Sequence, residues 1–164
     1  MTVWVTIHEY MLSSNTPYPG EVMARIKIDM PETFIFTTEI PVRVTDLNYG
    51  NHLANDALLS LLHEARVRFL AHFGWTEKNV AGVRIIMADC AIRYRGEGYY
   101  GDVLVIEMAV GEFTRAGFDL IYRVTEKLSG RPIAEAKTGI VFYNYERKKT
   151  VSVPTAFRQQ FEET

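Results

Sequence analysis

Hydrophobic residues fall at two different spacings along this chain, and the difference predicts one long helix followed by a series of strands. Within residues 55–74 the spacing is i, i+3/i+4, and the apolar residues that follow it are Leu58, Leu62, Ala65, Phe69 and Phe73. Other apolar residues occupy most of the remaining circumference, so we expect protein to cover this helix on nearly all sides. Asn55 is placed to cap its start, Asp56 suits its first turn, and Gly74 ends it.

Alternation of apolar and polar residues predicts strands on both sides of this helix. One such segment, residues 34–44, precedes the helix, and four follow it without another clear helical pattern: residues 84–95, 103–110, 118–124 and 133–145. Strands joined by short connections around a single helix favour an α+β fold. We therefore predict an antiparallel five-stranded sheet wrapped around one long central helix.

The segment 84–95 has two distinct faces. Cys90 alternates with the apolar residues of one face, so we expect it to lie in the core. Asp89, Arg93 and Arg95 fall on the other face. Asp89 is either a surface residue or part of an interface between subunits, and the alternation alone leaves both interpretations open.

The two ends of the chain carry weaker patterns. Residues 13–20 are rich in the turn-forming residues Ser, Asn, Pro and Gly. We predict an N-terminal extension or arm over residues 1–31 and a single domain over residues 32–164. Residues 1–22 are either partly an extension outside that domain or a short arm packed on its surface. The tail from residue 151 onwards shows no clear pattern.

Composition narrows the class of protein. A chain of 164 residues with 48% hydrophobic and 23% charged residues is typical of one globular domain. Its net charge of −2 gives no global basic field for nucleic acid. Cys90 is the only cysteine, and neither a secretory signal nor an apolar run of ~20 residues occurs. We expect a cytoplasmic protein, without membrane spans and without a metal site.

A polar loop over residues 45–54 leads directly into the long helix. The first backbone N–H groups of a helix lack intrahelical partners, and the helix dipole favours negative charge beside them. Such a site can polarise a carbonyl group and stabilise the oxyanion that forms when a thioester is attacked.

The residues of this loop and helix resemble those of a known family. The pattern Asp46-x-Asn48-x-x-x-His52-x-x-Asn55, followed by a helix that contains the sequence His63-Glu64-Ala65-Arg66, is similar to the hot-dog-fold acyl thioesterases. The closest group is the 4-hydroxybenzoyl-CoA thioesterase-like branch. The resemblance covers roughly residues 32–155 and includes the Gly101-Asp102 turn and Pro154.

The resemblance implies a fold, a substrate class and an assembly. It implies a hot-dog fold that hydrolyses an acyl-CoA or acyl-carrier-protein thioester without a cofactor. Hot-dog proteins usually dimerise through their sheets, so a homodimer or homotetramer is expected, with active sites between subunits near the helix N-terminus. Backbone N–H groups near Asn55 and Asp56 would polarise the thioester carbonyl, and an acidic side chain would act as general base or nucleophile.

The chain departs from the family pattern at one position. The loop of this branch commonly carries two acids spaced Asp-x-Asp, and Asn48 occupies the position of the second, catalytic acid. An amide cannot take a proton from water at neutral pH. The leading candidate substitute is Glu64, and Asp46 and Asp56 are the other candidates. The structural alternatives are an ion pair of Glu64 with Arg68, a turn role for Asp46, and a helix-dipole role for Asp56.

Other polar residues have paired interpretations. His52 either orients the carbonyl or a water molecule, or holds the loop together. Asn48 either hydrogen-bonds the attacking water or is a turn residue. Three cations either bind CoA phosphates or lie on a solvated face, and these are Arg93, Arg95 and Lys137.

Three functions remain open at this stage. The first is an acyl-thioester hydrolase. The second is a hot-dog hydratase or dehydratase, because Asp46 and His52 resemble the Asp and His of that family's motif, although the spacing is one residue longer. The third is a non-catalytic acyl-thioester binding protein in which Asn48 marks a lost base.

Overall fold

A computed structural model describes residues 26–162 of the chain. Its elements, in chain order, are β1 (Phe36–Pro41), η1 (Val44–Asp46), α2 (Asn55–His72), β2 (Arg84–Tyr94), β3 (Val103–Phe113), β4 (Gly117–Glu126), β5 (Pro132–Asn144), β6 (Lys149–Thr150) and α3 (Thr155–Glu162). The predicted long helix and all five predicted strands are confirmed. In this part of the chain no helix is long and apolar enough to cross a membrane.

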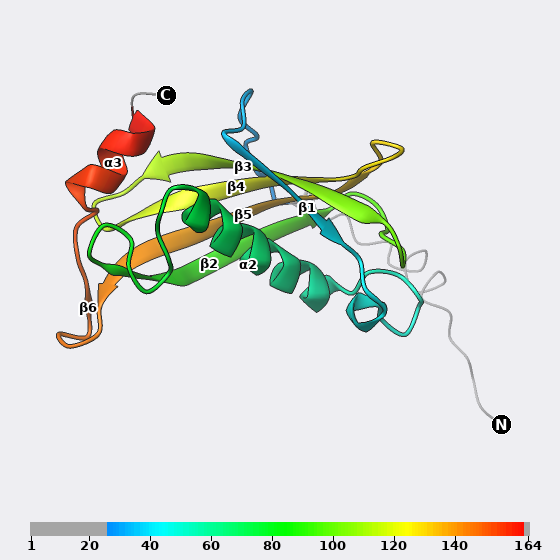
Figure 1. Ribbon diagram of the computed structural model, residues 1–164, viewed down its shortest axis with the longest axis horizontal. Coiled ribbons are helices and arrows are strands. Elements are labelled where there is room, and N and C mark those ends of the chain that lie inside the picture. The colour runs from blue at the N-terminus through cyan, green and yellow to red at the C-terminus, as the bar shows by residue number, and fades with distance from the viewer. Residues whose placement is uncertain (1–25, 163–164) are drawn as a thin grey trace, which may run out of the picture.

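The strands form one antiparallel sheet in the order β1-β3-β4-β5-β2, and the two-residue strand β6 adds to β5. Figure 1 shows α2 lying along one face of this curved sheet. This is the hot-dog arrangement, so the predicted α+β fold is confirmed. The five long strands and the central helix are the elements that position the candidate site.

The core lies between α2 and the inward face of the central strands. The helix contributes Leu58, Leu62, Ala65 and Phe69, all at most 1% exposed. Alternate residues of β3 and β4 meet them and are equally buried: Leu104, Ile106, Met108, Leu120, Tyr122 and Val124. Burying such side chains stabilises a protein by about 1.5–3 kcal/mol each, which fixes α2 against the sheet.

The N-cap of α2 lies one residue earlier than the sequence predicts. Ala54 is the N-cap, and Asn55 is the first helical residue, so the predicted capping role of Asn55 is wrong. The reason is the preceding loop, because the Ala54 N–H bonds the Asp46 carbonyl and the Ala54 carbonyl accepts the Leu58 N–H. No side chain caps this helix end. Asp56 does lie in the first turn, as predicted.

The helix α3 was not predicted. It packs Phe157 and Phe161 against Trp75, with ring centroids 5.2 and 6.1 Å from the indole. A helix of 8 residues is marginal in isolation, and its aromatic contacts with the rest of the chain are made with residues distant in sequence. The tail therefore gains its structure from tertiary packing, which the local pattern does not report.

Strand β2 forms an edge of the sheet. It pairs only with β5 within residues 26–162, and a register shift falls between Met87 and Asp89. Cys90 is exposed, so its predicted place in the core is wrong. Alternation assigned Cys90 to the inward face, but α2 packs chiefly against β1 and β3 and leaves that face of the edge strand β2 uncovered at Cys90. The long exposed edge of β2 is a template for pairing with another chain.

The outer face of the sheet, opposite α2, carries charges in register. Glu107, Arg123, Glu135 and Arg93 stand side by side on β3, β4, β5 and β2. Residues 27–31 lie on this face, where they line a hollow with Val110, Gly111 and Ile121. Ile28 is buried there. Residues 1–25 lie outside the described residues, so the boundary at residue 31 stays a prediction.

Candidate active site

The polar loop before α2 is closed by its own backbone. Leu47 and Leu53 pair as an isolated antiparallel bridge, and the Asn48 N–H bonds the His52 carbonyl at 2.9 Å. The Leu53 N–H bonds the Gly98 carbonyl at 2.7 Å, which ties the loop to the connection between β2 and β3. The loop is therefore held in place beside the start of α2.

Asn48 and His52 face each other within this loop. The Asn48 Oδ1 accepts the Gly50 N–H at 2.8 Å, and its Nδ2 lies 3.4 Å from His52 Nδ1. A methyl group on Gly50 would come within 2.9 Å of His52 Nε2 and 3.3 Å of Asn48 Oδ1. The absence of a side chain at residue 50 thus allows the two polar groups to come together. The structure shows the loop-holding contacts of both residues and leaves their parts in chemistry as proposals.

Asp46 is engaged by Arg43. Its carboxylate accepts the Arg43 backbone N–H at 2.8 Å and two guanidinium N–H groups at 3.0 and 2.9 Å. The side chain is almost fully buried, and these hydrogen bonds from Arg43 hold the pKa of Asp46 below its ordinary value. A buried carboxylate with a lowered pKa and filled acceptor positions is a weak base, and it fits the turn role.

Glu64 points toward β1. Its carboxylate accepts Arg68 Nε at 2.8 Å, and the same guanidinium reaches the Thr38 hydroxyl and the Glu39 carbonyl. The ion pair that the sequence offered as the structural alternative is therefore present. Glu64 also lies nine residues beyond Asn55, ~13 Å along the helix axis at about 1.5 Å per residue.

Asp56 is the acid nearest to the helix N-terminus. Its residue is exposed and forms no ion pair with any of residues 26–162. It lines a hollow of ≈ 220 Å³ that runs along α2 beside β2, together with Leu59, Ser60, His63, Arg66 and Met87. The nearby Asn55 carbonyl accepts the Tyr94 hydroxyl at 3.2 Å, which joins the end of β2 to the start of the helix.

A polar cluster lies deeper along the same side of the helix. Arg66 Nε donates to Glu77 Oε1 at 2.7 Å, and His63 Nε2 lies 3.0 Å from Glu77 Oε2. Arg66 Nη1 also lies 3.7 Å from the Met87 sulfur. Burial opposes ionisation of Glu77, but the contacts with His63 and Arg66 hold its pKa below the ordinary value.

The sequence interpretation missed this cluster. The available signal was the pair His63 and Arg66, polar residues spaced i, i+3 and therefore neighbours on the helix surface. Glu77 lies in the loop after α2, and nothing in the local sequence places its carboxylate under the helix. A second hollow, of ≈ 190 Å³, is lined by these three residues and by apolar residues of β2 and β5.

The three predicted phosphate-binding cations lie on the outer face of the sheet, where each is near an acid. Lys137 Nζ lies 3.0 Å from Asp119 Oδ2. Arg93 and Arg95 lie 3.6 and 3.9 Å from the carboxylate oxygens of Glu135. Since Arg93 and Arg95 share this one carboxylate among the ion pairs of residues 26–162, this corner keeps an excess of positive charge.

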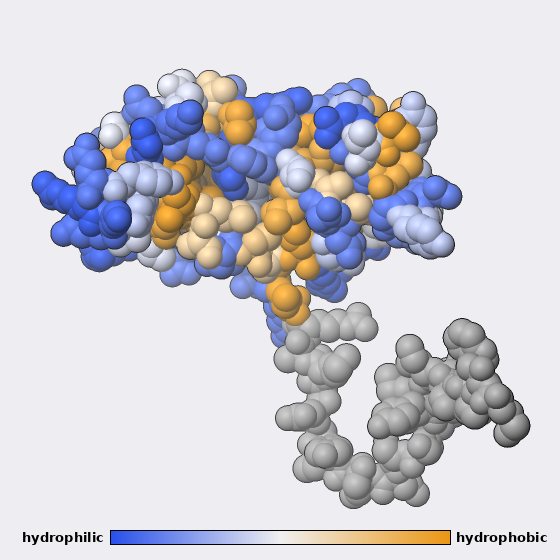
Figure 2. All heavy atoms as spheres, turned by 90° about the horizontal axis from the view of Figure 1, so that it is seen from below, coloured by the Kyte–Doolittle hydropathy of each residue, from blue (hydrophilic) through white to orange (hydrophobic). Residues whose placement is uncertain are grey.

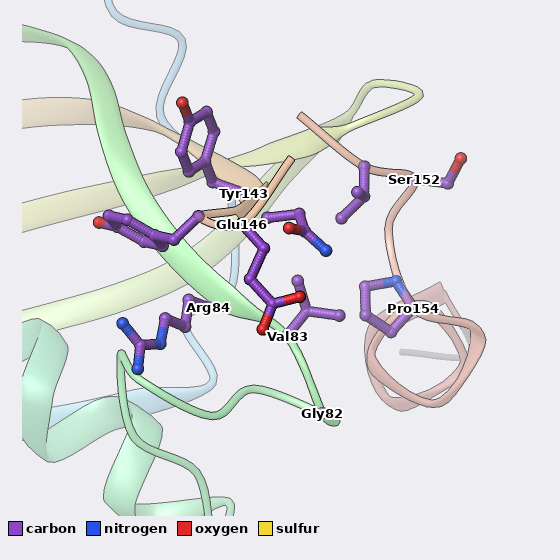
Figure 3. Close-up of a pocket in the computed structure, with 10 residues that line it drawn as sticks. Gly82, Val83, Arg84, Tyr143, Glu146, Ser152 and Pro154 are labelled. Atoms are coloured by element: carbon purple, nitrogen blue, oxygen red, sulfur yellow. The ribbon is translucent and has the colours of Figure 1, made fainter. Parts of the chain in front are cut away.

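Another hollow lies far from the helix N-terminus of the same chain. It has a volume of ≈ 700 Å³ and is lined by Arg84, Tyr143, Glu146 and Pro154, among others (Figure 3). The Arg84 guanidinium carbon lies 5.2 Å from the centroid of the Tyr145 ring. Arg84 begins β2 and Tyr94 ends it, so about 33 Å of extended strand separates this hollow from the Tyr94–Asn55 contact.

Solved structures share this fold. A 1,4-dihydroxy-2-naphthoyl-CoA thioesterase from Synechocystis is 20% identical, covers 76% of this chain and 93% of its own, and has a TM-score of 0.69. A thioesterase superfamily protein from Jannaschia sp. CCS1 is 21% identical, with 80% and 83% covered and a TM-score of 0.71. A gentisyl-coenzyme A thioesterase is 16% identical, with 75% and 99% covered and a TM-score of 0.67.

Sequence comparison extends this likeness from fold to family. No curated protein matches the chain in sequence. Residues 42–161, however, match the sequence profile of the thioesterase-like superfamily, and this range includes the polar loop, α2 and all strands from β2 onwards. The chain belongs to the thioesterase-like superfamily.

Proposed function

We propose that this protein hydrolyses acyl thioesters of coenzyme A or of an acyl-carrier protein at the N-terminus of α2. The observation that carries the proposal is the uncapped helix end beside an acid. The first intrahelical bond is made by Leu58, so the N–H groups of residues 55–57 have no helical partner, and no side chain caps them. Such groups suit the oxygen of a thioester carbonyl, which becomes negative as water attacks.

Asp56 is the proposed general base. Its carboxylate belongs to the same helical turn as the free N–H groups and lines the hollow beside β2. It accepts a proton from water as the water oxygen attacks the carbonyl carbon. The tetrahedral intermediate then collapses, the C–S bond breaks, and the thiol leaves with a proton. Asn48 and His52, next to this helix end, are proposed to orient the water or the carbonyl oxygen.

Two other acids remain in the proposal as alternative general bases, but each is less favourably placed than Asp56. The Asp46 carboxylate accepts three hydrogen bonds from Arg43 and is nearly inaccessible to solvent. Glu64 is paired with Arg68 and turned toward β1. Neither arrangement leaves a carboxylate oxygen free beside the helix N-terminus, whereas the carboxylate of Asp56 is exposed there.

The active unit is proposed to be a homodimer joined along β2, alone or within a tetramer. The 11-residue edge of β2 is unpaired within the described chain and exposes Met87 and Cys90. Figure 2 views the molecule from below Figure 1, the side on which β2 and α2 lie, and shows apolar side chains exposed among hydrophilic ones. Antiparallel pairing of two β2 strands would bring the Arg84 end of one copy beside the Tyr94 end of the other. The positive corner at Arg93 and Arg95 is then available for CoA phosphates.

Release of free thiol from a panel of acyl-CoAs tests the proposal. Turnover by the wild-type chain and a loss of 10²-fold or more in kcat for Asp56→Asn, on the order expected for general-base catalysis, would support it. The matched changes Asp46→Asn and Glu64→Gln identify the base, because the variant that loses turnover while still binding ligand carries it.

A non-catalytic acyl-thioester binding protein is the second candidate function, and the amide at residue 48 favours it. Absence of turnover for every acyl-CoA, together with a rise in melting temperature on adding one, would replace the hydrolase with a non-catalytic acyl-thioester binding protein. Hydration of an enoyl-CoA without thiol release would instead indicate the hydratase.

A further inference from the structure

Arg66 is the most deeply buried cation of the described chain that also lines a hollow. Its side chain is 9% exposed, yet it lies on both hollows along α2. A guanidinium group carries five N–H donors. Among residues 26–162 only two contacts of these donors meet hydrogen-bond criteria, namely Nε to Glu77 and Nη1 to the sulfur of Met87. A thioether sulfur is a weak acceptor, so the group keeps strong donors for a further oxygen.

Glu77 and His63 hold this guanidinium in one orientation. The Glu77 carboxylate bridges the two side chains, with contacts of 2.7 Å to Arg66 and 3.0 Å to His63. Apolar side chains line the rest of this hollow, namely Ile85, Ile86, Met87 and Ile140. A donor that is fixed and largely shielded from water discriminates strongly between a ligand that offers an acceptor and one that does not.

The position of Arg66 relative to Asp56 determines which part of a ligand it meets. The two residues line the same hollow, with Asp56 at the helix N-terminus and Arg66 ten residues further along. The Arg66 guanidinium contacts Glu77 and Met87 and lines this hollow, so it lies beyond Asp56 along the helix. An acyl group whose carbonyl lies at the helix N-terminus would extend along this hollow toward Arg66.

We propose that Arg66 is a specificity residue that selects acyl groups with a neutral oxygen acceptor at the end distal to the thioester. This inference rests on the proposed function, because it uses the helix N-terminus as the position of the carbonyl. A neutral oxygen suits the site better than a second carboxylate, since Glu77 already balances the charge of Arg66. A hydroxyl group accepts from the guanidinium, whereas a purely hydrocarbon acyl group in the hollow would displace water from the free donors and offer no acceptor in its place.

Binding of two hydrolysis-resistant thioethers tests the inference separately from catalysis. The probes are 4-hydroxyphenacyl-CoA and phenacyl-CoA, which differ only in the distal hydroxyl, and calorimetry measures their dissociation constants. The expected result for the wild-type chain is tenfold or more tighter binding of the hydroxylated probe, the value of a hydrogen bond to a charged group. Equal dissociation constants for the two probes would overturn the inference.

Variants then assign the preference to Arg66. Arg66→Met is expected to reduce the ratio of the two dissociation constants to about one, and Arg66→Lys to retain part of it, since lysine keeps the charge but loses the planar fork. Arg123→Met is the matched control, because Arg123 forms a similar pair with Glu107 on the outer face. A preference that survives in folded Arg66→Met would contradict the role of Arg66.

The same probes separate this inference from the proposed function. Binding with the expected preference, but no release of thiol from any acyl-CoA, would remove the hydrolase and leave the specificity role in place. Thiol release with equal affinity for both probes would do the reverse. If Arg66→Met fails to fold, the wild-type ratio and the Arg66→Lys ratio still decide the question.

Discussion

The carboxylate of Asp46 accepts three hydrogen bonds from Arg43, one from the backbone N–H and two from the guanidinium. This contact closes the turn that precedes the polar loop, and the Asp46 carbonyl accepts the Ala54 N–H at 2.9 Å. Ala54 in turn is the N-cap of α2. The position of the uncapped helix end, and with it the candidate active site, therefore depends on a carboxylate that is itself held by Arg43.

Replacing Asp46 by Asn should lower stability and leave the chemical mechanism intact. The amide loses the charge-assisted contacts to Arg43, and a loss of about 1 kcal/mol in the free energy of unfolding is expected, as for a lost helix cap. Urea denaturation at pH 7 measures it. A loss of kcat at unchanged stability would instead identify Asp46 as the base.

The same contact predicts a pH dependence. Hydrogen bonds from Arg43 hold the pKa of Asp46 below its ordinary value of 3.8. The ionised carboxylate therefore stabilises the fold fully above that pH, and this stabilisation is lost as pH falls through the lower pKa of the folded state. The stability difference between wild-type and Asp46→Asn should therefore shrink below about pH 4. A difference that stays constant down to pH 2.5 would show that the carboxylate charge is not involved.

Glu126 should make a second contribution to stability that is lost in acid. The N–H groups of Leu128 and Ser129 and the Ser129 hydroxyl bond its carboxylate and lower its pKa from 4.5 to about 2. The stabilisation is present above pH 4.5 and is lost as pH falls toward 2. Thermal unfolding of Glu126→Gln should depend less on pH over this range than wild-type. Glu112→Gln, the same change at an exposed site of β3, should follow the wild-type curve.

Adding a methyl group at Gly50 should disturb the active-site loop more than the fold. The new Cβ would lie 2.9 Å from His52 Nε2, so the imidazole must move away from Asn48. We expect kcat/KM to fall on the order of tenfold, as for a misplaced orienting group, with little change in melting temperature. The double variant with His52→Ala isolates the contact. If Gly50→Ala costs the same with and without the imidazole, the displacement of His52 is not the cause.

Local sequence patterns predicted the elements of this fold well and their exposure less well. The spacing of Leu58, Leu62 and Phe69 predicted α2, and all three are buried. Alternation predicted β2 but placed Cys90 in the core, because periodicity reports the face of a residue and not the place of its strand in the sheet. The side chain of Cys90 is uncovered because β2 is an edge strand and α2 packs chiefly against β1 and β3.

The candidate site was predicted only in part, for a similar reason. The polar loop and Asp56 lie next to each other in sequence, so the pattern could bring them together. Glu77 meets His63 and Arg66 across 14 and 11 residues through the loop after α2, a contact that requires the folded chain. The N-cap was also misplaced, because the hydrogen bond between Ala54 and Asp46 depends on how the loop closes.

An arginine at residue 90 should separate the proposed homodimer. Cys90 lies exposed in the middle of the unpaired edge strand, next to the register shift at Asp89. Pairing of two β2 strands about a two-fold axis brings like charges from Cys90→Arg close together, and like charges facing across strands are destabilising. Light scattering should show a shift from dimer toward monomer, with thiol release falling as the dimer is lost. Leu128→Arg is the matched control, since Leu128 is 93% exposed in the turn between β4 and β5. A Cys90→Arg chain that stays dimeric, or a monomer with full activity, would show that β2 does not join the active unit.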